Sequence, residues 1–210
     1  MWLLGLDVGQ RQDPACALLA ERVGQGYAAE YRVRWGMRWP LHTEYGAVAD
    51  AVEHVMTSPV FGGAAPTLIV DATGVGAPVV EMLRRRKLMP RAVQFTSGKT
   101  VTEGEGGMLR VPKADLVASL ALVMEQGRLK ISKKLEIAPQ IEHELKKFRM
   151  RRTKSGGQSY DAMKESDHDD LVDALCLICW WGERKLRFGH VETRRDRLTY
   201  TAALMQPVGG

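Results

Sequence analysis

The stretch SDHDDLVDALCLICWW, residues 166–181, places four aspartates and a histidine at the start of an apolar run. The run has the length and composition of a buried helix segment. On a helix, Asp170 and Asp173 share a face, as do Asp169 and Asp173, because positions three and four apart are neighbours. Carboxylates this close repel one another unless a cation lies between them. The helix dipole could stabilise an acidic first turn, but Asp173 lies inside the apolar run, which favours a metal site.

The chain of 210 residues has a net charge of +5, which permits a nucleic-acid partner. Its length suits one α/β domain, expected over residues 1–187, with residues 188–210 as a polar tail. Three cysteines without histidines at ligand spacing indicate small core residues in a reducing compartment. Asp7 interrupts the N-terminal apolar run, and residues 171–181 are too few to span a bilayer. We therefore expect a soluble intracellular protein without a membrane partner.

Short apolar runs separated by turns predict an α/β fold with a mixed sheet of about five strands flanked by helices. The predicted strands cover residues 2–8, 15–23, 27–35, 67–70 and 91–95, with residues 128–132 as a further edge strand. The predicted helices cover residues 43–56, 77–87, 112–126 and 137–148, and residues 97–107 form a loop. Short turns join the first three strands, which indicates an antiparallel meander. The later strand, helix and strand require a parallel crossover.

Two further carboxylates stand at the ends of predicted strands. Asp7 ends the first strand and Asp71 ends the fourth. In an open α/β sheet, sites form at strand ends beside a topological switch, and the acidic helix could bring Asp170 and Asp173 to the same place. Three or more carboxylates without a histidine pair favour hard cations, so we expect Mg²⁺ or Mn²⁺.

Four segments of the chain match one pattern in order and spacing. They are GLDVGQRQDPACALL (residues 5–19), IVDATGVGAPVVEML (69–83), PKADLVASLALVMEQGRLKI (112–131) and HDDLVDALCL (168–177). Together they resemble the nuclease domain of large terminase subunits from tailed bacteriophages. The resemblance implies a ribonuclease H-like fold and a two-metal endonuclease that cuts concatemeric viral DNA during genome packaging.

The resemblance also implies roles for the aspartates. By position in the motifs, Asp7 and Asp71 match the strand ligands of the family, and both Asp170 and Asp173 fit its helix ligand. Two ions about 3.5–4 Å apart would share a bridging carboxylate, which we assign to Asp7. One ion would activate a water and the other would stabilise the leaving 3′-oxygen, so no side-chain nucleophile is required.

Three neighbouring residues have less direct roles in this scheme. Asp169 is a lesser candidate ligand, and His168 is a candidate for orienting or tuning the ligands. Asp13 also recurs in the first motif of the family. For Asp13, a turn or capping role is an equal alternative.

A basic segment precedes the acidic helix and is the candidate DNA-binding element. Its residues are Lys146, Lys147, Arg149, Arg151, Arg152 and Lys154. Positive side chains near a metal site could neutralise DNA phosphates and hold the backbone over the ions. Gly156 and Gly157 would let a hairpin move, which resembles the regulatory hairpin of terminase nucleases. The alternative is a solvated loop whose charge aids solubility.

The partners implied by the resemblance are double-stranded DNA, a packaging ATPase and portal or small terminase components, in the host cytoplasm. The sequence SGKT at residues 97–100 is not a nucleotide-binding P-loop, because Val93 stands where the motif requires glycine. Two other functions stay open. One is a resolvase of the same superfamily that acts on branched DNA, and the other is a non-catalytic DNA-binding module of the packaging machinery.

Overall fold

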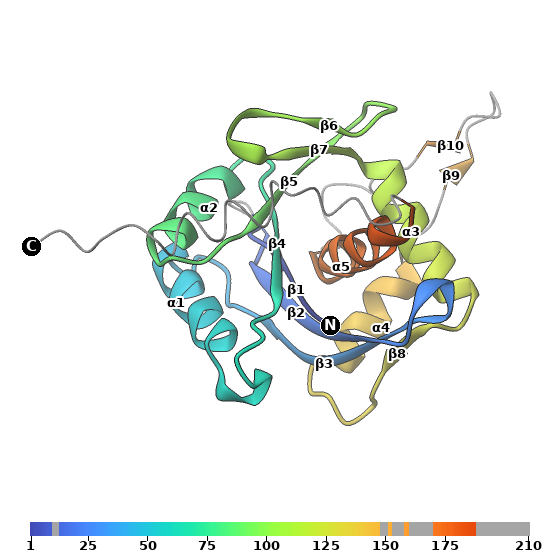
Figure 1. Cartoon of the computed structure of the whole chain (residues 1–210), viewed down its shortest axis with the longest axis horizontal. Coiled ribbons are helices and arrows are strands. Elements are labelled where there is room, and N and C mark those ends of the chain that lie inside the picture. The colour runs from blue at the N-terminus through green and yellow to red at the C-terminus, as the bar shows by residue number, and fades with distance from the viewer. Residues whose placement is uncertain (10–12, 148–150, 153–157, 160–169, 188–210) are drawn as a thin grey trace, which may run out of the picture.

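In the computed structural model, a mixed sheet of eight strands is covered by helices on both faces (Figure 1). The structure describes residues 1–9, 13–147, 151–152, 158–159 and 170–187. The strands of the main sheet are β1 (Trp2–Asp7), β2 (Cys16–Val23), β3 (Glu30–Arg38), β4 (Thr67–Asp71), β5 (Arg91–Thr96), β6 (Thr102–Glu103), β7 (Leu109–Pro112) and β8 (Leu129–Ile131). The helices are α1 (Tyr45–Met56), α2 (Gly76–Arg85), α3 (Lys113–Glu125), α4 (Ala138–Lys147) and α5 (Asp170–Arg187). The predicted α/β class with a mixed sheet is confirmed.

The sheet has the order β6-β7-β5-β4-β1-β2-β3-β8. Strands β1, β2 and β3 form the predicted antiparallel meander. Strand β4 lies parallel to β1 and β5 lies parallel to β4, with α2 as the crossover that the sequence required. Strands β2 and β3 are therefore added on one side of β1, and β4 and β5 on the other. The carboxyl ends of β1 and β4 thus lie at the topological switch point of the sheet.

The sheet differs from the prediction in its strand count and in the start of β3. Strands β6 and β7 were not predicted, because two and four residues are too few to show an alternating pattern. Strand β3 begins at Glu30, since a short 3-10 turn over Gly26–Ala28 precedes it and leaves Tyr27 exposed. The predicted edge strand is confirmed as β8, which pairs in parallel with β3.

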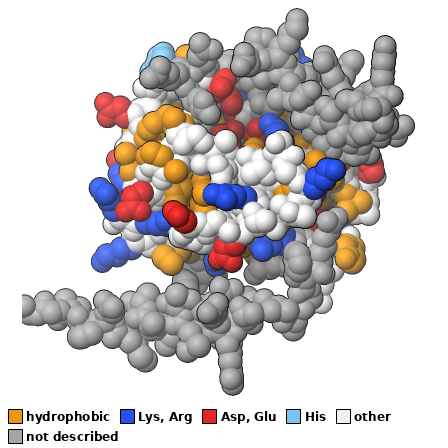
Figure 2. Space-filling view, turned by 90° about the horizontal axis from the view of Figure 1, so that it is seen from above, with side chains coloured by type: hydrophobic (Ala, Val, Ile, Leu, Met, Phe, Trp, Pro, Cys, Tyr) orange, Lys and Arg blue, Asp and Glu red, His pale blue; other side chains and the backbone are white. Residues whose placement is uncertain are grey.

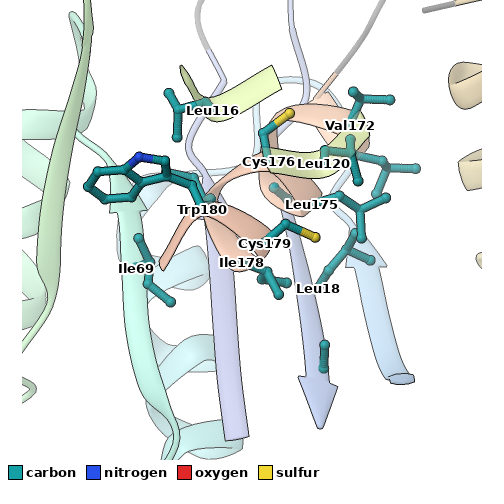
Figure 3. Close-up of a cluster of buried hydrophobic side chains, with 14 of the residues drawn as sticks. Leu18, Ile69, Leu116, Leu120, Val172, Leu175, Cys176, Ile178, Cys179 and Trp180 are labelled. Carbon is teal, nitrogen blue, oxygen red and sulfur yellow. The ribbon is translucent and has the colours of Figure 1, made fainter. Parts of the chain in front are cut away.

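Two hydrophobic cores lie on opposite faces of the sheet. On one face, α1 and α2 pack on side chains that include Leu4 and Leu6 of β1. On the other face, α5 lies against the sheet with α3 and α4 beside it (Figure 1). Figure 3 shows side chains of α5, such as Leu175 and Ile178, packed among those of α3 and the strands. Because successive side chains of a strand alternate, Leu3, Gly5 and Asp7 all belong to the face that α5 covers.

Gly5 allows α5 to lie directly on β1. A Cβ atom at this position would stand 2.5 Å from the carbonyl oxygen of Ala174 and 3.0 Å from the side chain of Ile178. Real Cβ atoms do not come this close to backbone oxygens, so any larger residue would push the helix away from the strand. The close approach brings the first turn of α5 to the carboxyl end of β1.

A buried ion pair holds the other end of α5. Arg128 donates to both carboxylate oxygens of Glu183, at 2.9 and 3.0 Å, and Tyr31 Oη donates to Glu183 Oε1 at 2.8 Å. Burial acts to raise the pKa of Glu183, but the hydrogen bonds from Arg128 and Tyr31 outweigh it and hold the pKa below its usual value. The helix is therefore fixed at this end by a satisfied, charged contact with Tyr31 of β3 and with Arg128, the residue before β8.

The basic segment and the tail are described only in part. Strands β9 (Arg151–Arg152) and β10 (Gln158–Ser159) form an antiparallel pair, as a hairpin would. The predicted tail, residues 188–210, lies outside the described residues. Among the helices that the structure describes, none has the length and apolar character needed to cross a bilayer.

Candidate metal centre

Asp7 and Asp71 stand side by side at the carboxyl ends of β1 and β4. The parallel register pairs Leu6 with Val70, so the next residue of each strand is one of the two aspartates. Both lie on the α5 face, because they alternate with Leu6 and Val70, which belong to the opposite core. Backbone N–H groups hold the two carboxylates: Gly9 donates to Asp7 Oδ1 at 3.1 Å, and Thr73 donates to Asp71 Oδ1 at 2.8 Å.

Asp170 and Asp173 come from the first turn of α5, where the sequence placed them. Both are buried, with 5% and 7% of their surface exposed. The apolar residues that surround them in sequence, from Leu171 to Trp180, are all buried, so the packing of α5 on the sheet dictates the position of its acidic turn. A third element thereby brings carboxylates towards the ends of β1 and β4.

The pKa of Asp7 reflects the other three carboxylates. Burial raises this pKa well above its ordinary value of 3.8, and the charges of Asp71, Asp173 and Asp170 raise it further. The hydrogen bond from Gly9 opposes these effects without cancelling them. The site therefore concentrates negative charge that a cation would relieve.

Asp71 has a more balanced environment. Burial raises its pKa, whereas hydrogen bonds from Thr73 and the charge of Lys113 lower it, and the net pKa stays raised. Thr73 is itself fixed, because its Oγ1 accepts the Phe95 N–H at 2.9 Å. The turn after β4 thus orients Asp71 through a link to β5.

Two cationic side chains that were not predicted from the sequence border the site. Lys113 Nζ, at the start of α3, lies 3.1 Å from Asp173 Oδ2. Arg38 Nη2, at the end of β3, lies 3.5 Å from Asp170 Oδ2. Neither residue stands in a cluster of like charges, so the sequence offered no local signal for them. Each is brought in by the sheet, because β3 and β7 end near the same edge as β1 and β4.

Glu144 is the third residue that the sequence analysis missed. It is buried on α4 and pairs with Arg38. Its Oε2 also accepts the backbone N–H groups of Leu171 and Val172 at 3.0 and 3.3 Å. The sequence does hold one indication of a role for Glu144. This residue stands three positions after Ile141 on the apolar face of its helix, where an unpaired charge would be costly.

The donor set has the chemistry of a divalent-cation site, but its side chains are not arranged as a finished one. Among the residues described, no group of three or more His, Cys, Asp or Glu side chains stands ready to hold a metal ion. Asp170 and Asp173 instead contact Arg38 and Lys113. A set of carboxylate oxygens fits Mg²⁺ or Mn²⁺, because both are hard cations that prefer oxygen ligands.

The remaining predicted site residues are placed only in part. His168 and Asp169 lie outside the described residues, as do Arg149 and Lys154. Asp13 lies in the connection from β1 to β2, and Arg151 and Arg152 form β9. Lys146 and Lys147 are exposed in the last turn of α4.

On the face drawn in Figure 2, the Lys and Arg side chains of the described residues are scattered among acidic and uncharged groups.

An α/β sheet with carboxylates at the ends of neighbouring parallel strands, crossed by a helix that starts with two more, defines a ribonuclease H-like domain. The chain belongs to the terminase RNaseH-like domain family, whose profile matches residues 4–179. The family predicted from the four sequence segments is confirmed. No match was found among curated proteins.

Solved structures of terminase nucleases share this fold. The large terminase nuclease from thermophilic phage G20c is 20% identical, with a TM-score of 0.58 over 85% of this chain and 80% of that one. The human cytomegalovirus terminase nuclease domain, Mn soaked and inhibitor bound, is 12% identical, with a TM-score of 0.57 over 89% and 85%. The nuclease domain of the large terminase of bacteriophage SPP1, with bound Mn, is 13% identical, with a TM-score of 0.53 over 84% of each chain.

Proposed function

We propose that the chain is a metal-dependent DNA endonuclease that cuts concatemeric viral DNA during genome packaging, with residues 1–187 as its nuclease domain. The observation that carries the proposal is the placement of Asp7 and Asp71 at the ends of adjacent parallel strands, with the buried Asp170 and Asp173 in the first turn of the helix that packs on them. The pKa of Asp7, raised by burial and by the charges of these three aspartates, agrees with this placement. A protein does not gather such charge at a strand end without a cation or a proton to balance it. Family membership, the SPP1 nuclease domain with bound Mn and the Mn-soaked cytomegalovirus nuclease domain support the cation.

Asp7, Asp71, Asp170 and Asp173 are the proposed ligands of two Mg²⁺ or Mn²⁺ ions. When bound, such ions activate a water for attack on phosphorus and stabilise the leaving oxygen. The residues of the chain do the rest. Gly9 and Thr73 donate backbone N–H groups to the strand carboxylates and so orient them. Their amide hydrogen bonds favour the ionised carboxylates and so partly offset the effect of burial, which raises the pKa of both aspartates.

Lys113 is proposed to contribute positive charge beside the ligands. Its ammonium group lies 3.1 Å from Asp173 and lowers the pKa of Asp71, so it favours the ionised form of the site before any ion binds. A fixed cation at this position would also attract the phosphate of an approaching DNA strand. The basic segment from Lys146 to Lys154 is the proposed path for the rest of the duplex.

The proposed partners are double-stranded DNA and the components of a packaging machine, namely an ATPase motor and portal or small terminase proteins. Supercoiled plasmid incubated with Mg²⁺ or Mn²⁺ tests the activity, with EDTA as the control. Conversion to nicked and linear forms that EDTA abolishes is the expected result. No cleavage in either metal would overturn the enzyme assignment and leave the non-catalytic DNA-binding module.

A second substrate separates the proposal from its nearest alternative. A four-way DNA junction and a linear duplex of the same sequence are compared at equal concentration and saturating metal. A packaging nuclease should cut the two at similar rates, whereas a resolvase should strongly prefer the junction. A strong junction preference would therefore reassign the site to branched DNA.

A further inference from the structure

The first turn of α5 is held by a side chain from another helix. Glu144 of α4 accepts the N–H groups of Leu171 and Val172, which are among the donors that a helix leaves unpaired at its start. Local Ser, Thr, Asp or Asn residues usually supply such a cap. Here the acceptor stands 27 residues earlier in the chain than Leu171 and is itself buried. A buried carboxylate at this point also complements the positive end of the helix dipole.

Arg38 links this cap to the proposed ligand. Its Nη2 contacts Glu144 Oε1 and also lies 3.5 Å from Asp170 Oδ2, so one guanidinium nitrogen serves two carboxylates. The two carboxylates are both buried, and each would repel the other without the cation between them. Arg38 therefore ties β3, α4 and α5 together beside Asp170. A guanidinium is suited to this role, because its planar set of N–H donors can serve two carboxylates at once.

We propose that Glu144 and Arg38 are positioning residues of the metal site, which fix the first turn of α5 and orient Asp170 towards the cations. The inference rests on the proposed function, since it assigns Asp170 as a ligand. Neither residue is itself a proposed metal ligand. Their effect is on the affinity for metal, because ligands that are held in place lose less freedom when the ion binds. Outer partners of this kind typically change metal affinity or activity by about 10–100-fold.

The test is calorimetric titration of Mn²⁺ into the folded protein without DNA. Glu144→Gln keeps the shape of the cap and removes its charge, and Arg38→Met removes the link to Asp170. Each is expected to weaken Mn²⁺ binding about tenfold or more.

Matched controls come from the same elements. Glu142 is an exposed glutamate of α4 that pairs with Lys146, and Arg34 is a surface arginine of β3 that pairs with Glu21. Glu142→Gln and Arg34→Met should leave the affinity unchanged.

Two further measurements separate positioning from a general loss of stability. Amide hydrogen exchange should accelerate at Leu171 and Val172 in Glu144→Gln but not at Ile178, which lies two turns further along the buried helix. Cleavage by Glu144→Gln should recover towards the wild-type rate at saturating Mn²⁺, because the chemistry of the bound ions is intact. A rate that stays equally low at all metal concentrations would contradict a positioning role.

The outcomes distinguish this inference from the proposed function. Wild-type protein that binds no Mn²⁺ overturns the proposed function. Wild-type protein that binds Mn²⁺, with Glu144→Gln binding it equally well, overturns only the positioning role. If Glu144→Gln does not fold, Arg38→Met decides the question, and wild-type affinity in that variant overturns the inference.

Discussion

Asp7 and Asp71 end two neighbouring parallel strands at the same level, because Leu6 pairs with Val70 in the register of β1 and β4. Strands in a sheet stand about 4.8 Å apart, so two side chains on the same face at one level are close neighbours. Each carboxylate is held by a backbone N–H two residues further along the chain. This pair is the rigid half of the site, and α5 supplies the other half.

Replacing Asp71 by Asn should abolish metal-dependent cleavage and leave the fold intact. The change removes one negative charge from the ligand set, and the loss of a bound ion would remove several kcal/mol of transition-state stabilisation, a factor of about a thousand or more. Plasmid cleavage with Mg²⁺ measures it, with circular dichroism to check folding. Asp50→Asn, at an exposed aspartate of α1, is the control. Nicking by Asp71→Asn at the wild-type rate would falsify the ligand assignment.

Replacing Asp7 by Asn should stabilise the protein in EDTA at neutral pH. Because the folded-state pKa of Asp7 is raised, the folded protein binds the proton more tightly than the unfolded chain does. This contribution to wild-type stability is therefore lost as pH rises from the ordinary Asp pKa of 3.8 through the raised value. Asn carries no such penalty, and its amide oxygen can still accept the Gly9 N–H. Urea denaturation across this pH range measures the difference, which should vanish at the acid end. A variant less stable than wild type at pH 7 would contradict this account of Asp7.

Replacing Lys113 by Met should raise the pKa of Asp71 in the metal-free protein. The positive charge of Lys113 favours the ionised carboxylate, so its removal makes the proton harder to release. Carboxyl NMR titration in EDTA follows Asp71 directly. Lys130→Met is the control, since Lys130 pairs with Glu30 on the far part of β3. An unchanged titration of Asp71 would show that Lys113 does not act on it.

Replacing Glu183 by Ala should destabilise the protein by about 3–5 kcal/mol, because it leaves Arg128 charged and buried without its partner. The free energy of unfolding in urea measures the loss. Glu142→Ala removes an exposed ion pair on α4 and should have no measurable effect. Equal stabilities of the two variants would mean that the Arg128–Glu183 pair does not anchor α5.

Replacing Arg149, Arg151 and Arg152 together by Ala should weaken DNA binding and flatten its salt dependence. Each phosphate contact contributes about 0.9 to the slope of log affinity against log salt, so three contacts account for about 2.7. Fluorescence anisotropy with duplex DNA and EDTA measures the slope without cleavage. The triple change of Arg32, Arg34 and Lys130, on β3 and β8, removes the same charge and should leave the slope unchanged. An unaltered slope in the first variant would remove the basic segment from the DNA interface.

The α/β class, the meander and the parallel crossover could be predicted from the sequence, and so could the positions of the four aspartates, whose role as ligands stays a prediction. These features depend on local patterns: alternating or continuous apolar runs, turn residues, and acidic residues placed at the ends of such runs. Asp7 and Asp71 could be identified because each ends an apolar strand, and Asp173 because it interrupts an apolar helix. In the same way, the four matching segments identified the family.

The residues that surround those aspartates could not be predicted from the sequence, because they come together only in the folded chain. Arg38 and Asp170 are 132 residues apart in the chain, Lys113 and Asp173 are 60 apart, and Glu144 and Leu171 are 27 apart. No local pattern records such contacts, because they arise from the order of the strands and from the close packing of α5 on Gly5. The short strands β6 and β7 also gain their structure from pairing with a neighbour, not from their own residues. The aspartates could therefore be identified from the sequence. Their contacts with Arg38 and Lys113, and the Glu144 cap of α5, exist only in the folded chain.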